Sequence, residues 1–132
     1  MIVDWELVNG ISGQIVDSAI AVHQTLGPGL LESTYQACLG YELRKRRLNV
    51  LEQLGLPAVY DAQRFDIGYR IDLLVHNFVV VEIKAIEAIE AIAPIHRAQL
   101  LSYLKLSGKP LGLLLNFNVV LLKQGIVRMR NG

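Results

Sequence analysis

The sequence predicts a mixed α/β domain in which helices flank a central β-sheet, with the elements in the order ααβββαββ. Three observations support this: helical spacing of apolar residues early in the chain, two Val- and Ile-rich runs between 69 and 85, and a third apolar run at 111–117. At 132 residues the chain can bury one hydrophobic core, so we expect a single domain over residues 1–132.

Two helices are expected before the sheet. Between residues 11 and 26 apolar side chains recur every three or four positions, and Gly27-Pro28-Gly29 ends the helix. A second helix is expected from about 30 to 47, and residues 1–10 are expected to be a loosely ordered start. The buried side of the second helix would carry Leu31, Tyr35, Cys38, Leu39 and Leu43.

The expected sheet begins near residue 49. Residues 49–60, with Pro57 inside, predict an edge strand or an irregular extended segment, because proline cannot donate to a central ladder. A polar connection at 61–68 follows. Two central strands are then expected at about 69–75 and 79–85.

The last third of the chain begins with a turn and a helix. Proline is favoured in the first helical turn, so we expect a short turn at 86–93 and a helix at 94–107, ended by Gly108. The remaining elements are a buried strand at 111–117 and, within 119–130, one more strand or a hairpin around Gln124-Gly125.

Composition excludes several classes of protein. A net charge of +1 gives no global attraction to nucleic acid, so any basic surface must be local. A single cysteine, Cys38, excludes an internal disulfide framework and a cysteine-rich zinc site. We see no signal peptide, and the apolar run at 111–122 is too short for a membrane span, so no membrane is expected and the cytoplasm is the expected location.

Three charged residues lie inside the two central strands: Asp72, Glu82 and Lys84. Side chains alternate between faces along a strand, so Glu82 and Lys84 share one face. Carboxylates in a buried strand are costly unless they are paired or bind a cation, and oxygen ligands of this kind suit Mg²⁺. The alternative is a cross-strand salt bridge that also includes Arg70.

The strand register decides whether the two carboxylates can meet. A three-residue loop, 76–78, pairs Val75 with Val79 and places Asp72 opposite Glu82. A two-residue loop would place them on opposite faces of the sheet. Because the three-residue loop also makes the other face wholly apolar, with Ile71 opposite Ile83, burial favours this register.

The arrangement of Asp72 and Glu82-Ile83-Lys84 resembles the core of the PD-(D/E)xK nuclease superfamily. Gly29-Leu-Leu-Glu32-Ser-Thr-Tyr35 matches the motif that names the GxxExxY family, a branch of that superfamily. Gln99-Leu-Leu-Ser-Tyr103 matches the QxxxY motif of RecB-type nucleases, and the segment 112–118 is also similar to that family. The resemblance implies a restriction-endonuclease-like core.

It also implies a metal-dependent nuclease that hydrolyses phosphodiester bonds of nucleic acid, with DNA as the expected substrate and Mg²⁺ or Mn²⁺ as cofactor. The implied metal ligands are Asp72, Glu82 and the backbone carbonyl of Ile83, with His23 and Glu32 as further candidates. Glu32, Asp72, Glu82 and Lys84 would be catalytic, with Lys84 near the attacking or transition-state oxygens.

Three further residues are implied to position the substrate: Tyr35, Gln99 and Tyr103. Tyr35 lies one helical turn after Glu32, and a core tyrosine with a satisfied hydroxyl is the alternative. His96, Gln99 and Tyr103 share one helical face, for which an ordinary polar face is the alternative.

Two basic features also have an alternative interpretation. His23 could simply complement the dipole at a helix C-terminus. The Arg44-Lys45-Arg46-Arg47 cluster could be a solvated helix end or could contact phosphates.

A second function remains open: a catalytically degenerate nuclease fold that binds nucleic acid or a protein partner. The intact acidic and lysine set argues against it. The small size argues for it, because no separate substrate-recognition domain is visible, although a homodimer or a partner protein could supply that surface. The sequence leaves DNA versus RNA, and endonuclease versus exonuclease, undecided.

Overall fold

The computed structural model describes residues 2–87 and 93–132, and their elements follow the predicted order. The helices are α1 (Trp5–Leu26), α2 (Glu32–Lys45) and α3 (Pro94–Ser107); the strands are β1 (Val50–Tyr60), β2 (Gln63–Val75), β3 (Val79–Lys84), β4 (Leu111–Asn116) and β5 (Ile126–Arg130); and a 3-10 helix, η1 (Leu122–Gly125), precedes β5.

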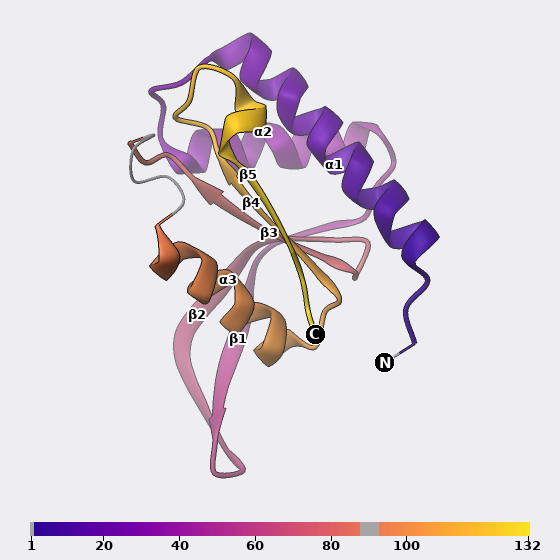
Figure 1. Ribbon diagram of the computed structural model, residues 1–132, viewed down its shortest axis with the longest axis vertical. Helices are drawn as coiled ribbons and strands as arrows, with labels where there is room; N and C mark the ends of the chain where they lie inside the picture. The colour runs from indigo at the N-terminus through magenta and orange to yellow at the C-terminus, as the bar shows by residue number, and fades with distance from the viewer. Residues whose placement is uncertain (1, 88–92) are drawn as a thin grey trace.

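The strands form a five-stranded sheet in the order β1-β2-β3-β4-β5. Neighbouring strands are antiparallel except β3 and β4, which are parallel and are connected through α3. Figure 1 shows α1 and α2 on one side of the sheet and α3 on the other. The fold is therefore the expected mixed α/β arrangement, consistent with a restriction-endonuclease-like core.

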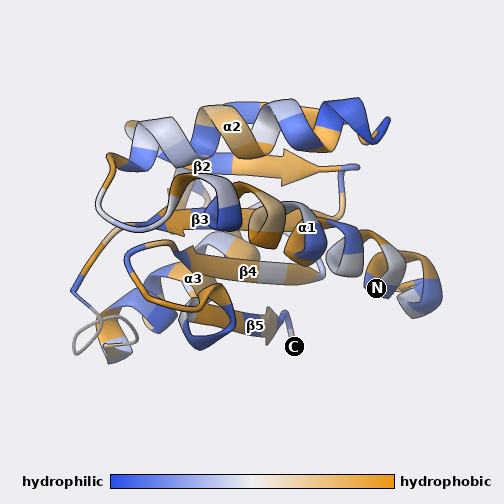
Figure 2. Cartoon of the chain, turned by 90° about the horizontal axis from the view of Figure 1, so that it is seen from above, coloured by the Kyte–Doolittle hydropathy of each residue, from blue (hydrophilic) through white to orange (hydrophobic). Residues whose placement is uncertain are grey.

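Each face of the sheet has its own hydrophobic cluster. The larger cluster joins α1 and α2 to alternate residues of β3 and β4, and the smaller one joins α3 to the opposite face. Figure 2 shows the strands mostly in the hydrophobic colour and the helices striped with both colours, as amphipathic helices on a buried sheet require. Gly112 lets α3 approach, because a Cβ there would lie 2.8 Å from Cδ1 of Leu100.

The first helix begins earlier than expected. Residues 1–10 were expected to be loosely ordered, but α1 starts at Trp5. The Asp4 side chain accepts a hydrogen bond from the amide of Leu7 at 3.1 Å, which is a typical helix N-cap. Val8 is buried, so this extra turn also packs against the core.

The expectation of a polar connection at 61–68 is wrong. The turn is only Asp61-Ala62, both with positive φ, and β2 begins at Gln63 and pairs with β1. The side chains from Val59 to Arg70 are exposed, so they show no burial pattern, yet the two strands satisfy each other's backbone hydrogen bonds. β1 and β2 therefore extend past the rest of the sheet as a long arm (Figure 1).

One local expectation near a turn also needed correction. Leu31 was expected on the buried side of α2 but is 73% exposed, because it occupies the N-cap position before the helix turns its apolar side to the sheet. Of the two alternatives for residues 119–130, the additional strand is confirmed as β5, and η1 covers the position of the alternative hairpin around Gln124-Gly125. The predicted edge strand is confirmed as β1, and the predicted helix at 94–107 is confirmed as α3.

The predicted hairpin register is confirmed, because Val75 pairs with Val79 across a three-residue loop. His76 and Asn77 in that loop both have positive φ. One detail of the predicted faces is wrong: Ile71 belongs to the cluster on the α3 face instead of lying with Ile83 on the other face. Between Leu73 and Ile71, the regular pairing of β1 with β2 lacks the pair of Gln53 with Asp72, and Gln53 has a positive φ.

The turn expected at 86–93 includes residues 88–92, which lie outside the described residues. None of the helices in the described ranges has the length and apolar character needed to cross a membrane.

Candidate active site

Asp72 and Glu82 meet where the regular pairing of β2 and β3 ends. The last regular pair is Leu73 with Val81. Beyond it, Oδ2 of Asp72 accepts a hydrogen bond from the amide of Ile83 at 2.8 Å, and Oε1 of Glu82 accepts one from the amide of Asp72 at 3.3 Å. The Glu82 carboxylate thus binds the amide of Asp72, and the Asp72 carboxylate binds the amide that follows Glu82. These two bonds hold the side chains next to each other.

Glu82 is a buried carboxylate with an unusual proton affinity. Only 5% of the residue is exposed. Burial, and then the negative charge of Asp72, raise the pKa of Glu82 to about 8. The electrostatics therefore disfavour two adjacent ionised carboxylates, and a bound cation would remove that penalty.

The donor set fits a hard divalent cation. Asp72 and Glu82 supply carboxylate oxygens, the ligands that Mg²⁺ and Mn²⁺ prefer. Within residues 2–87 and 93–132, no three His, Cys, Asp or Glu side chains are grouped as a metal site, so water and substrate oxygens would complete the coordination. The Ile83 carbonyl as a further ligand stays a prediction.

Lys84 is held in place by a line of polar side chains from α3. Its Nζ donates to Oε1 of Gln99 at 3.2 Å, and Nε2 of Gln99 donates to the hydroxyl of Tyr103 at 3.3 Å. Burial, and then the charge of Glu82, raise the pKa of Tyr103, so its hydroxyl lies within the influence of the carboxylates. Of the two residues of the QxxxY pattern, Gln99 thus contacts the lysine directly and Tyr103 contacts Gln99.

Glu32 reaches the same end of β3 from α2. Its Oε2 accepts a hydrogen bond from the amide of Ala85, the residue after Lys84, at 3.2 Å. The side chain is otherwise exposed at the start of α2. Glu32 is therefore available to the region around Lys84, and its role as a catalytic or metal-binding group stays a prediction.

Tyr35 fixes the turn that presents Glu32. It is fully buried, and its ring stacks on Phe117 with centroids 4.5 Å apart. The hydroxyl donates to the carbonyl of Gly27 at 2.6 Å and accepts from the amide of Leu30 at 3.1 Å. Gly29, with φ +98°, makes the sharp bend in this turn possible. These contacts favour the core-tyrosine alternative for Tyr35 over direct substrate contact.

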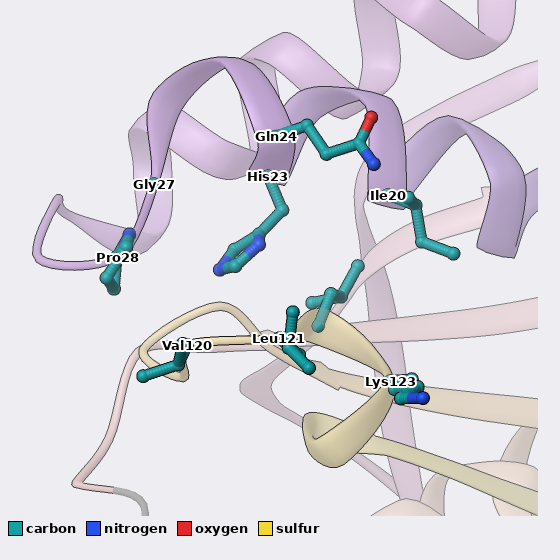
Figure 3. A pocket seen from close by; sticks show the side chains of 9 residues that line it. Ile20, His23, Gln24, Gly27, Pro28, Val120, Leu121 and Lys123 are labelled. Atoms are coloured by element: carbon teal, nitrogen blue, oxygen red, sulfur yellow. The ribbon is translucent and has the colours of Figure 1, made fainter.

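His23 lies in different surroundings. Its ring points toward the loop between β4 and η1 (Figure 3), and Nε2 is 2.8 Å from the carbonyl of Val119. The ring also lies 6.2 Å from that of Phe117. Since Nε2 is engaged by a backbone carbonyl, the structure does not bring it together with Asp72 and Glu82, and its part in a metal site stays a prediction.

Most of the basic cluster at the end of α2 is neutralised by carboxylates of this chain. Arg44 binds Glu52 at 2.8 Å, and Arg46 binds Asp17 at 2.6 Å. Lys45 lies 3.1 Å from Glu42. These pairs favour the interpretation of the cluster as a solvated helix end.

Asn116, a residue without an assigned role in the sequence analysis, holds the chain just after Lys84. It is fully buried, and it bonds both sides of the Ile86 backbone: Oδ1 accepts from the amide and Nδ2 donates to the carbonyl, each at 3.1 Å. A buried asparagine in an otherwise apolar strand was the available signal, because such a polar group needs partners.

Gln53 on β1 was missed as well. Its Nε2 donates to Oδ1 of Asp72 at 3.2 Å and to Oε1 of Gln36 at 2.7 Å. Its φ of +51° is unusual for a residue other than glycine, and such strain is common at functional sites. Nothing in the residue type signals this conformation, so the sequence could not have indicated it.

One of three comparisons with known proteins found a match. A family model described as the PD-(D/E)XK nuclease superfamily matches residues 9–129. No curated protein and no solved structure matches the chain.

Proposed function

Since the chain belongs to the PD-(D/E)XK nuclease superfamily, we propose that it is a metal-dependent nuclease that hydrolyses phosphodiester bonds of nucleic acid, with DNA as the expected substrate. The observation that carries the proposal is the meeting of Asp72 and Glu82 beside Lys84, which is aimed by Gln99. We further place the chain in the GxxExxY branch and near RecB-type nucleases, on the motifs around Glu32 and Gln99.

In the proposed reaction a water oxygen attacks phosphorus, one P–O ester bond breaks, and the leaving oxygen takes up a proton. A divalent cation, Mg²⁺ or Mn²⁺, would supply Lewis-acid activation and charge neutralisation when held by Asp72 and Glu82. The ammonium of Lys84 lies on the same strand face as Glu82, where it would stabilise the negative charge that develops on the phosphate.

Two neighbouring groups support this lysine. Gln99 accepts a hydrogen bond from Lys84 and so limits the positions that the ammonium can take. Glu32, bonded to the amide of Ala85 at the same end of β3, would orient the attacking water. Positioning of this kind matters because catalysis of phosphoryl transfer rests mainly on alignment and electrostatics.

The direct test is cleavage of single- and double-stranded DNA and RNA with Mg²⁺ or Mn²⁺, beside a Lys84→Ala control. We expect wild-type protein to cleave with metal and to be inactive with EDTA. Metal binding without any cleavage would instead favour the alternative of a degenerate module that binds nucleic acid or a partner. A cytoplasmic location and a homodimer or protein partner stay predictions from the sequence.

A further inference from the structure

A hollow of about 670 Å³ opens beside Lys84, between α3 and the base of the β1–β2 arm. Its size is in the range of pockets that hold small organic ligands. The polar groups of its lining come from Lys84, His96, Gln99 and Ser102, and the remainder is mainly apolar. The main apolar contributors are Ala58, Tyr69, Ile95, Tyr103 and Leu106.

Two tyrosine rings lie next to each other, tilted, in the lining of this hollow. Tyr103 is buried, and Gln99 donates a hydrogen bond to its hydroxyl. Tyr69 projects from β2 and is 44% exposed, and the two ring centroids lie 6.2 Å apart at 54°. The pair therefore combines a fixed ring next to the carboxylates with a second ring that solvent and ligands can reach.

The exposed apolar side chains on the α3 side extend this surface. Ile95 is 71% exposed and Leu106 is 38% exposed, and both line the hollow. Apolar surface of this kind next to a lysine and two carboxylates has no role in binding a phosphate. It matches a ligand in which a flat apolar face is carried on the sugar next to a phosphodiester.

We propose that this hollow takes an unpaired nucleobase adjacent to the phosphate at Lys84, so that the protein acts on single-stranded or locally unpaired nucleic acid. The inference rests on the proposed nuclease function and names its substrate class. A base in a duplex has both faces stacked and its edge paired, so it cannot enter such a hollow unless it is first unpaired.

The charge balance points the same way. Duplex binding relies on many phosphate contacts from Lys and Arg, whereas single-strand binding gains much of its affinity from bases stacked on aromatic side chains. The net charge of +1 offers little for the first mode, and three of the clustered basic residues on α2 are paired within the chain. Tyr69 and Tyr103 offer the second mode at the site itself.

The test measures binding, so that it does not depend on cleavage. The probes are a fluorescent oligothymidylate, an oligomer of the same length made of abasic residues, and a blunt duplex, each titrated by anisotropy with Ca²⁺ present. The variants are Tyr69→Ala, the conservative Tyr69→Phe, and Tyr41→Ala as a matched control, since Tyr41 is 67% exposed on α2.

We expect wild type to prefer oligothymidylate, and Tyr69→Ala to weaken that binding roughly tenfold, since one stacked base contributes ~1–3 kcal/mol. Tyr69→Ala should barely change binding of the abasic oligomer, Tyr69→Phe should restore the preference, and Tyr41→Ala should behave as wild type. Tyr69 is 44% exposed and Tyr41 is 67% exposed, so we expect each of these proteins to fold.

Three results would overturn the inference: no binding of oligothymidylate, an equal loss for both single-stranded probes in Tyr69→Ala, or equal wild-type affinity for the duplex. Cleavage assays separate this failure from that of the proposed function. Stacking that depends on Tyr69 in a protein that cleaves nothing would uphold the base site and reject the nuclease. Rapid duplex cleavage that Tyr69→Ala leaves unchanged would uphold the nuclease and reject the base site.

Discussion

Oδ2 of Asp72 accepts a hydrogen bond from the amide of Ile83 at 2.8 Å, at the point where β2 and β3 cease to pair regularly. A side chain here takes the place of a backbone carbonyl. The strands can therefore separate without leaving this amide unpaired, which would be costly in the interior. The opening created in this way is where the two carboxylates and the lysine lie.

The first prediction concerns metal affinity. Asp72→Asn and Glu82→Gln should each weaken Mn²⁺ binding strongly, because each removes a charged ligand. Loss of a residue that only supports a metal ligand lowers metal affinity by roughly 10–100-fold, and we expect a larger loss here. Both variants should stay folded, since each replaces a carboxyl group by an amide of similar shape and removes the cost of ionising two adjacent carboxyl groups, of which that of Glu82 is buried. Calorimetry gives the affinities, and Asp66→Asn, an exposed position on β2, is the matched control. Unchanged affinity in both site variants would exclude the site.

The second prediction concerns the stability of the metal-free protein. Burial raises the pKa of Glu82 from the 4.5 that is usual for a glutamate to about 8, so between these values the folded state holds a proton that the unfolded state has lost. The contribution of Glu82 to the free energy of unfolding should therefore be greatest below about pH 4.5. It should fall as the pH rises to about 8.

The slope is bounded at about 1.4 kcal/mol per pH unit for a single group. Urea unfolding in EDTA at several pH values measures it. Glu82→Gln should flatten the profile between these values and make the protein more stable than wild type at alkaline pH. Identical pH profiles for the two proteins would contradict the assignment of a raised pKa to Glu82.

The third prediction separates binding from chemistry at Lys84. Its ammonium is not a metal ligand, so Lys84→Ala should keep the wild-type Mn²⁺ affinity while turnover falls by about 10²–10³, the usual effect of removing one transition-state donor. Gln99→Ala should cause a smaller loss, because Gln99 only orients the lysine. Single-turnover cleavage rates decide this, with Lys45→Ala as an exposed control; wild-type rates in Lys84→Ala would rule the role out.

The fourth prediction concerns the strained residue beside the site. Gln53→Gly should raise the free energy of unfolding by about 1 kcal/mol, because glycine accepts positive φ without steric cost. The same change removes the amide that bonds Asp72, so Mn²⁺ affinity should fall roughly tenfold.

A residue with only a structural role would not move stability and metal affinity in opposite directions. Gln53→Asn should shift both quantities in the same directions as Gln53→Gly, since asparagine tolerates positive φ and its shorter side chain should fall short of Asp72. Equal metal affinity in wild type, Gln53→Gly and Gln53→Asn would show that Gln53 does not position Asp72.

The sequence alone was sufficient for the order of elements and for the register of the central hairpin. Residue spacing within α3 and the Pro94 and Gly108 signals fixed that helix, because capping and periodicity act over a few neighbouring residues. The register followed from burial, since a one-residue slip would have exposed the apolar face around Val75 and Val79. These effects are local, or depend on a single pair of adjacent strands.

Only the tertiary structure decided how distant segments meet around that hairpin. The positive φ of Gln53, the buried ring of Tyr35 under the Gly27 turn, and the placement of His23 against Val119 depend on contacts between elements far apart in the chain. The hollow at Tyr69 likewise needs both the β1–β2 arm and α3. Such contacts cannot be derived from residue types and spacing, because the packing of whole elements determines which side chains face one another.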